Sequence, residues 1–237
     1  NPKISGTFTD EKNLPHDLDL IISIGGDGTF LECVTLVQKN EIPIVGINSG
    51  HLGFLANISK EDILSALESI IIKDFKIEKR VLIEVCTKNN LFGNFNYGLN
   101  ELTVHKKDTS SMITIDVFIN DDFLNTYWAD GLIISTPTGS TAYSLSAGGP
   151  IIVPGSGNFV ITPISPHNLT VRPIVIPDTN ILKLIVRGRS TDFLASLDSR
   201  SASFDSSVEL LVRKADFHIN MIKFKKSNFF TTLRNKL

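Results

Sequence analysis

The stretch that decides the fold runs from residue 18 to residue 29, Leu18-Asp19-Leu20-Ile21-Ile22-Ser23-Ile24-Gly25-Gly26-Asp27-Gly28-Thr29. Its first half is apolar, as expected of a buried strand, and apolar residues at helical spacing follow the glycines as far as about Gln38. A second strand-like run spans Ile42 to Ile47. Strand, glycine turn, helix and strand in this order predict an α/β domain with parallel strands.

From about Lys79 the pattern changes to strand-length runs in which apolar and polar residues alternate, such as Met112 to Ile119. No segment of helical periodicity longer than about a dozen residues occurs before Asn220. We therefore expect an α/β domain over residues 1–78 and a β-rich, β-sandwich-like domain over residues 79–220. Residues 221–237 are a segment that can return to the first domain.

Composition excludes several classes of protein. The chain has 237 residues, 42% of them hydrophobic, and a formal net charge of −2. Its apolar runs are far shorter than the roughly 20 residues that span a membrane, and balanced charge provides no basic field, so we expect neither a membrane nor a nucleic-acid partner.

Cys33 and Cys86 lie far apart in apolar contexts, which predicts two buried free thiols and a cytoplasmic protein. The chain begins without methionine, so we expect it to cover part of a longer protein.

The glycine turn Gly25-Gly26-Asp27-Gly28-Thr29 is the first candidate site. Its three glycines permit positive φ angles and a close approach to a ligand, and free N–H groups at the start of the following helix suit a polyphosphate. Asp27 is unusual there, because a carboxylate repels phosphate. It indicates a task, either holding Mg²⁺ or accepting a proton from an attacking hydroxyl. The alternative is a simple turn in which Asp27 caps the helix.

Standard nucleotide and hydrolase motifs do not fit this sequence. Counted from Gly26, Leu31 stands where a G-x-G-x-x-G fingerprint needs its third glycine, and no glycine precedes a lysine as in a Walker A loop. No G-x-S-x-G elbow occurs. These absences argue against a Rossmann dehydrogenase, a P-loop kinase and a serine hydrolase.

Three further segments carry polar or glycine-rich patterns. The loop Asn48 to Leu55 follows the second strand, so it should line one crevice with the glycine turn. Within it we interpret His51 as a structural hydrogen-bonding residue, and Phe54 either belongs to the core or flanks an adenine. The block Asp130 to Pro150 crowds hydroxyls and glycines after a strand, as a polar-ligand loop does. The pair Asn100-Glu101 is weaker: an amide can bind an adenine edge and a carboxylate a ribose.

In this order and at these intervals, the four segments resemble the NAD kinase family over roughly residues 18–220. The glycine turn alone is shared with diacylglycerol and sphingosine kinases and, in a related form, with phosphofructokinases, whereas the 130–150 block is far more specific. The resemblance implies the NAD kinase-like two-domain architecture. It also implies transfer of the terminal phosphoryl group of ATP, or of polyphosphate, to the adenosine ribose 2′-hydroxyl of NAD, forming NADP. A divalent cation, Mg²⁺ or Mn²⁺, and a homo-oligomer, dimer or tetramer, belong to the same expectation.

Carried over by motif, the resemblance makes Asp27 the general base, and Gly25, Gly26, Gly28 and Thr29 would hold the phosphates. Asn100 would contact adenine, Glu101 and Asp130 the ribose or the nicotinamide side, and Phe54 would help to surround the adenosine. The NAD-binding residues that it implies are Asp27, Gly28, Phe54, Asn100, Glu101, Asp130, Thr138, Thr141, Ala142, Tyr143, Ser144, Leu145, Ser146 and Arg200.

Two positions depart from the family pattern, and two alternatives stay open. Trp128 stands where many bacterial members carry a basic residue, and Arg200 where a glutamine is common. A lipid kinase of the diacylglycerol type shares the glycine turn but needs a membrane-docking surface, for which only the basic stretch from Met221 to Leu237 offers support. A non-catalytic NAD(H) sensor would have no need of Asp27 beside phosphates.

Overall fold

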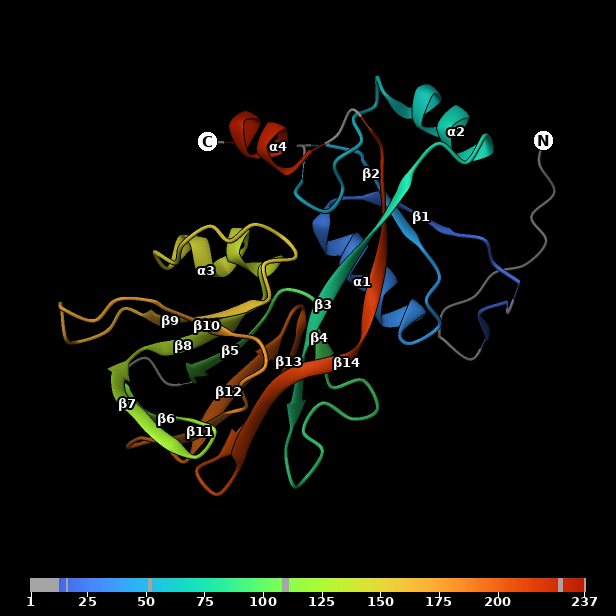
Figure 1. Ribbon diagram of the computed structural model, residues 1–237. Coiled ribbons are helices and arrows are strands. Elements are labelled where there is room, and N and C mark those ends of the chain that lie inside the picture. The colour runs from blue at the N-terminus through green and yellow to red at the C-terminus, as the bar shows by residue number, and fades with distance from the viewer. Residues whose placement is uncertain (1–12, 16, 51–52, 108–110, 226–227, 237) are drawn as a thin grey trace. The chain divides into compact units, whose positions relative to one another are not determined.

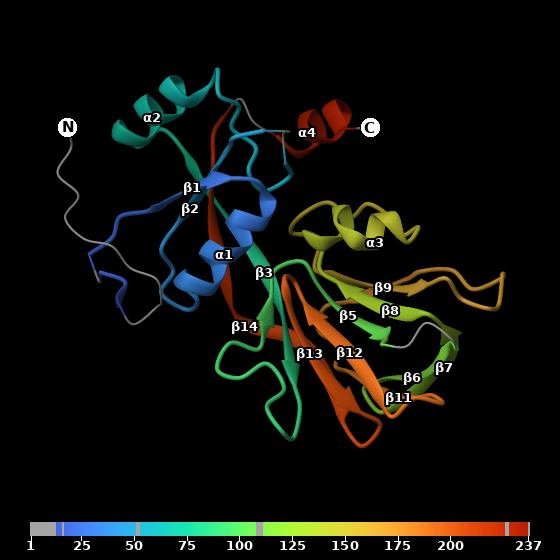
Figure 2. The same cartoon turned by 180° about the vertical axis from the view of Figure 1, so that it is seen from behind.

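The computed structural model describes residues 13–15, 17–50, 53–107, 111–225 and 228–236. Within them the chain divides into two units, one drawn from Asn1–Lys79 and His218–Leu237 and the other Arg80–Phe217 (Figures 1 and 2). Two long strands, β3 (Lys76–Cys86) and β14 (Glu209–Lys223), contribute residues to both units. The chain therefore passes out of the first unit and returns to it.

The first unit has the predicted parallel strands. β1 (Ile21–Gly25) pairs in parallel with β2 (Ile44–Asn48), and the end of β14 pairs in parallel with β2. All residues of β2 are buried, as expected of a strand covered on both faces. The helices of this unit are α1 (Asp27–Val37), α2 (Ile63–Ile71) and α4 (Phe229–Lys236). The predicted order of strand, glycine turn, helix and strand is confirmed, with β1 beginning at Ile21 rather than at Leu18.

The second unit is built almost entirely from antiparallel strands. One sheet has β7, β6, β11 and the first part of β14 side by side, with β3 pairing β14 and β4, and the other has the order β10-β9-β8-β5-β12-β13. The strands are β4 (Tyr97–Gly98), β5 (Glu101–Lys106), β6 (Ile113–Ile119), β7 (Asp122–Ala129), β8 (Gly131–Ser135), β9 (Asn158–Ile164), β10 (Ile174–Pro177), β11 (Leu182–Arg187), β12 (Asp192–Leu197) and β13 (Arg200–Asp205). A 3₁₀ turn, Gly139–Thr141, and the short helix α3 (Tyr143–Ser146) follow β8.

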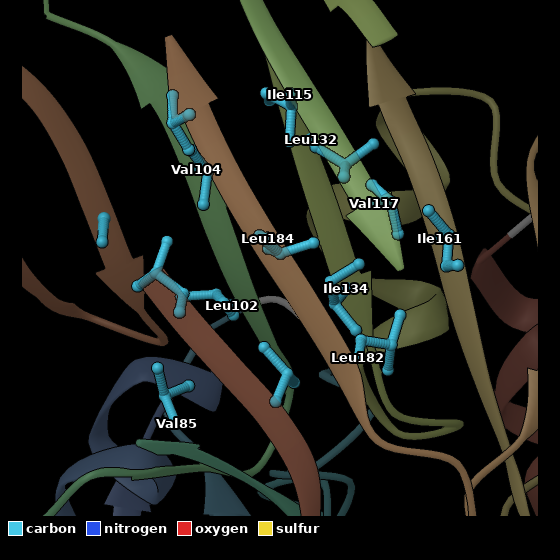
Figure 3. Close-up of a cluster of buried hydrophobic side chains, with 14 of the residues drawn as sticks. Val85, Leu102, Val104, Ile115, Val117, Leu132, Ile134, Ile161, Leu182 and Leu184 are labelled. Atoms are coloured by element: carbon cyan, nitrogen blue, oxygen red, sulfur yellow. The ribbon is translucent and has the colours of Figure 1, made fainter. Parts of the chain in front are cut away.

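The core of the second unit lies between its two sheets (Figure 3). Leu102 and Val104 of β5 are buried in one cluster with Val117 of β6 and Leu184 of β11. Because side chains alternate along a strand, Glu101 and Thr103 of β5 lie on the opposite face of their sheet. The expected β-sandwich-like domain is confirmed, and its packing fixes which residues of β5 and β8 face away from the core.

Cys33 and Cys86 are free thiols, as predicted, but each is half-buried rather than buried. Burial still raises the pKa of both thiols. Among the described residues, no helix combines the length and the apolar character needed to cross a bilayer.

Candidate functional site

The glycine turn of the first unit leads from β1 directly into α1. Gly26 is the N-cap, with φ −99°, and its carbonyl accepts the first helical hydrogen bond, from the Phe30 N–H at 3.2 Å. The N–H groups of the first helical turn have no partner within a helix, which favours an anion in front of them. Gly26 and Gly28 are exposed, and a Cβ at either would meet no atom within 4 Å.

One expectation about this turn is wrong. None of its glycines has a positive φ angle, so the turn does not need glycine for that reason. Gly25 is required by a contact instead, since a Cβ there would lie 2.3 Å from Oγ1 of Thr29. At Gly26 and Gly28 the missing side chain leaves the backbone open to solvent.

Asp27 is the first residue of α1, and its carboxylate binds the loop that follows β2. Oδ2 accepts a hydrogen bond from the N–H of Phe54 at 2.9 Å. Oδ1 accepts hydrogen bonds from the N–H groups of Leu55 at 3.0 Å and Ala56 at 2.9 Å. We call these bonds the Asp27 clamp. The alternative in which Asp27 caps its own helix is wrong, because α1 has no side-chain cap.

Counting the bonds made by the described residues, the clamp leaves one acceptor position of the Asp27 carboxylate for a further donor. An ionised carboxylate has about four acceptor positions, and the clamp uses two on Oδ1 and one on Oδ2. Oδ2 therefore keeps a lone pair. A hydroxyl placed there could donate its hydrogen bond and then its proton, which is the geometry that a general base needs.

The 48–55 loop meets the glycine turn, as the argument from strand ends predicted. Its fold depends on Asn48, whose Nδ2 donates to the carbonyl of Ala56 at 3.2 Å and whose Oδ1 accepts from the N–H of Gly50 at 2.7 Å. His51, which we interpret from the sequence as a structural hydrogen-bonding residue, lies outside the described residues. Phe54 is half-buried, with its ring 6.2 Å from that of Phe229 in α4 and the Lys236 ammonium 5.4 Å from its centroid.

In the second unit, the sheet face turned away from the core carries polar residues. Strand pairing places Glu101 opposite Ser135, and Thr103 opposite Ser196 on the other neighbouring strand. Glu101 and Ser135 are buried, yet Glu101 Oε2 and Ser135 Oγ have no hydrogen-bond partner. Unpaired buried polar atoms are rare in proteins, and a ligand or a water that completes their hydrogen bonds is one explanation for them.

The Glu101 carboxyl is also electrostatically unusual. Burial, reinforced by the nearby Asp198 carboxyl, raises the pKa of Glu101 to about 8. A carboxyl whose ionisation lies close to neutral pH, next to an unpaired hydroxyl, is a candidate for ligand recognition.

The 130–150 block packs against Asn100. Thr136 Oγ1 donates to the carbonyl of Leu99 at 2.6 Å, and the Thr136 N–H donates to the carbonyl of Asn100 at 2.9 Å. Gly139 lies so close that a Cβ would be 2.1 Å from the Asn100 carbonyl oxygen. The structure thus brings the predicted pair Asn100-Glu101 and the predicted polar loop together.

The remaining predicted residues of the second unit differ in accessibility. Asp130 is half-buried and forms a 2.5 Å salt bridge with Lys106. Thr138 and Ser144 are buried. The Thr138 hydroxyl accepts a hydrogen bond from Arg80 Nη1 at 3.2 Å, and the Ser144 hydroxyl is hydrogen-bonded to Thr162 Oγ1 at 2.9 Å. Thr141, Ala142 and Leu145 are half-buried, and Tyr143 and Ser146 are exposed. The last five residues provide side-chain surface on and around α3, whereas Thr138 and Ser144 are already engaged.

Sequence reasoning missed two residues, one in each unit, that help to position the candidate site residues. Asp198, at the turn between β12 and β13, accepts hydrogen bonds from the N–H groups of Leu99, Asn100 and Glu101. Gly53 sits under the Asp27 carboxylate, where a Cβ would be 1.9 Å from Oδ1. The positive φ angle of Asp198 cannot be read from the sequence. In the sequence, Gly53 is not distinguished from other loop glycines. Arg200, which the resemblance places at the ligand, donates through its guanidinium to the carbonyls of Phe95 and Tyr97.

Within the described ranges, no group of three or more His, Cys, Asp or Glu side chains is arranged to hold a metal ion. The described residues therefore provide no protein cage for Mg²⁺ or Mn²⁺, and they fit such a cation only where it arrives on nucleotide phosphates and keeps several waters.

Known proteins of one family match both parts of the chain. Residues 8–75 match the model of the ATP-NAD kinase N-terminal domain, and residues 99–224 that of the ATP-NAD kinase C-terminal domain. The NAD kinase of Cytophaga hutchinsonii is 48% identical over 236 residues, which cover 100% of this chain and 80% of that protein. The NAD kinase of Flavobacterium psychrophilum is 50% identical over 242 residues, covering 100% and 82%.

Two solved structures have the same fold. A crystal structure of yeast NADH kinase complexed with NADH has a TM-score of 0.83 at 26% identity, covering 92% of this chain and 66% of that one. An NAD kinase from Archaeoglobus fulgidus in complex with ATP has a TM-score of 0.80 at 27% identity, covering 93% and 83%. Fold, turn and polar face together define a two-domain nucleotide phosphotransferase. Within that class, the chain belongs to the NAD kinase family.

Proposed function

We propose that this member of the NAD kinase family uses Asp27 as the general base that takes the proton of the adenosine ribose 2′-hydroxyl of NAD. The observation that carries the proposal is the Asp27 clamp, which fixes the carboxylate at the start of α1 and leaves one lone pair of Oδ2 free. A fixed acceptor costs little reorganisation when the proton moves, and general-base catalysis contributes about 10²–10⁴ in rate.

The phosphoryl donor, ATP or polyphosphate, is assigned to the glycine turn. Gly26 and Gly28 are exposed, and the first N–H groups of α1 have no partner within a helix. The Thr29 side chain occupies the space that a Cβ on Gly25 would need. We assign Gly25, Gly26, Gly28 and Thr29 to phosphate binding for these reasons.

The dinucleotide is assigned to the polar sheet face of the second unit and the loop around α3. Asn100 and Glu101 are held at the start of β5, and Glu101 has an unpaired buried oxygen for a ribose hydroxyl. Asp130 and the exposed side chains of Tyr143 and Ser146 extend the same assignment. Both NADH kinase from yeast and this chain share the fold on which that assignment rests.

The reaction forms one O–P bond and breaks another. The 2′-oxygen attacks the terminal phosphorus, its proton passes to Oδ2 of Asp27, and the bond to the remaining donor phosphates breaks with its electron pair going to them. The chain's contribution is positioning and neutralisation of charge, because phosphoryl transfer needs little covalent work from a protein. A divalent cation, Mg²⁺ or Mn²⁺, would neutralise donor phosphate oxygens when bound.

The test is NADP formation from NAD, followed with an NADP-specific dehydrogenase, using ATP and polyphosphate in separate arms with Mg²⁺ or Mn²⁺. We expect Asp27→Asn to keep NAD affinity and to lose about 10²–10⁴-fold in kcat. Asp62→Asn, at the exposed N-cap of α2 in the same unit, is the matched control and should retain activity. Turnover of Asp27→Asn within about threefold of wild type rejects Asp27 as the base.

The assembly and location are also proposals. The family resemblance supports a homo-oligomer, a dimer or a tetramer, which light scattering at several protein concentrations would test. Two free thiols with no disulfide between them are in keeping with a cytoplasmic protein. Fractionation of the native host would test that location.

A further inference from the structure

The turn between β12 and β13 binds the backbone of the segment that ends in Asn100 and Glu101. Asp198 Oδ2 accepts from the Leu99 N–H at 2.7 Å, and Oδ1 accepts from the N–H groups of Asn100 at 2.9 Å and Glu101 at 3.1 Å. The Asp198 N–H donates in return to the Glu101 carbonyl at 3.1 Å. One side chain therefore fixes consecutive peptide groups just where β5 begins.

Arg200, two residues later, holds the same segment further upstream. Its Nη1 and Nη2 donate to the carbonyls of Phe95 and Tyr97, and its guanidinium lies 4.9 Å from the centroid of the Phe95 ring. Anionic Asp198 binds N–H groups and cationic Arg200 binds carbonyls, so each charge meets the complementary end of the peptide dipole. Together they hold the stretch from residue 95 to residue 101 against the hairpin turn.

The backbone at Asp198 has a left-handed conformation. Its φ angle is 52°, a left-handed value that Asn, Asp and Gly tolerate better than other residues. Glycine or asparagine would suit the turn itself at least as well. The carboxylate is accordingly explained by its bonds to Leu99, Asn100 and Glu101, not by the turn.

We propose that Asp198 is a positioning residue that sets the place of Asn100 and Glu101 for recognition of the dinucleotide. The inference rests on the proposed function only in assigning NAD to these two residues. Asp198 does not contact the dinucleotide: it acts through the peptide groups that precede and begin β5. Removing the carboxylate frees those peptides to move, and Asn100 and Glu101 then lose their fixed orientation.

The experiment compares Asp198→Asn and Asp198→Gly with Asp205→Asn. Both Asp198 variants keep a turn-compatible residue. The control removes an exposed carboxylate of β13 that accepts a hydrogen bond from the Ser207 N–H in its own turn. We expect both Asp198 variants to weaken NAD binding, measured by calorimetry, by about tenfold or more, while KM for the phosphoryl donor changes by less than about twofold. Asp205→Asn should match wild type.

Amide hydrogen exchange supplies a readout independent of turnover. In the wild-type chain, the Leu99 and Asn100 amides should be protected although they precede the ladder of β5, and the Asp198 variants should lose that protection. Unprotected amides in the wild type, or unchanged NAD affinity in both variants, overturn the inference. Equal losses toward NAD and toward the donor also overturn it, as a general structural defect. If the wild-type chain binds NAD but forms no NADP, the proposed function fails while the binding and exchange results still decide the role of Asp198.

Discussion

Gly53 lies directly beneath the carboxylate of Asp27, so that a Cβ at residue 53 would be 1.9 Å from Oδ1 and 2.6 Å from Cγ. Asp27 is the first residue of α1, which follows β1, whereas Gly53 lies in the loop that follows β2. Their contact explains why the loop can bring three successive N–H groups to one carboxylate. The absent side chain of Gly53 is thus part of the Asp27 clamp.

Gly53→Ala should displace Asp27 and disrupt its clamp. The added methyl group cannot fit beside Oδ1, so we expect kcat to fall by about tenfold or more and stability to fall by about 1–3 kcal/mol. Gly50→Ala is the matched control in the same loop, because a Cβ there meets nothing within 4 Å. Steady-state kinetics and thermal melts of both variants measure the effect; equal activity of the two would contradict the role of Gly53.

Gly139→Ala should disturb Asn100, one of the residues to which we assign NAD. A Cβ at residue 139 would be 2.1 Å from the Asn100 carbonyl oxygen and 2.7 Å from Asn100 Cα, both backbone atoms. We expect KM for NAD to rise by about tenfold, with a smaller change for the phosphoryl donor. Ser156→Ala, at an exposed residue of the same unit, is the control. An unchanged KM for NAD would show that Asn100 is not part of its site.

Glu101→Gln should change how stability depends on pH. Burial and Asp198 raise the pKa of Glu101 to about 8 in the folded chain, from an ordinary value of 4.5. Between these values the folded state binds more protons than the unfolded state, so the wild-type chain loses stability as pH rises from 4.5 to about 8. The glutamine variant lacks this contribution.

Melting temperatures at pH 5, 6, 7 and 8 (about one unit apart) would reveal the Glu101 contribution as a difference in slope between the wild type and Glu101→Gln. Glu209→Gln, at an exposed position of β14, should follow the wild-type slope. Parallel pH profiles for wild type and Glu101→Gln are the result that contradicts a raised pKa.

Phe229→Ala should act on the Asp27 clamp from α4. The Phe229 ring lies 6.2 Å from that of Phe54, whose N–H is one of the clamp's donors. Without the ring contact we expect Phe54 to be less fixed and kcat to fall by about tenfold, with a smaller change in NAD affinity. Phe230→Ala, at the neighbouring exposed aromatic, should change kcat by no more than about twofold. Equal effects of the two substitutions on turnover count against this link.

The local patterns of the sequence predicted the elements well. Apolar runs and alternation predicted the parallel strands of the first unit and the β-rich second unit, because buried strands require those residues wherever they lie in the chain. The glycine turn, the 48–55 loop, the Asn100-Glu101 pair and the 130–150 block carried enough residue identity to indicate the family. Each of these signals is contained within a few consecutive residues.

What the tertiary structure decided is which distant groups meet. Asp27 binds N–H groups some 27 to 29 residues away, and Asp198 binds N–H groups 97 to 99 residues away, and neither pairing leaves a local pattern. The same holds for Gly53 and Gly139, whose need for glycine comes from a neighbour across space rather than from a positive φ angle. By itself, the sequence determined the strands, the helix after the glycine turn and the polar segments, because backbone propensity and hydrophobic periodicity are local. The partners of Asp27, Asp198 and Arg200 depended on the folded chain, because hydrogen bonds between remote peptides form only once packing has placed them.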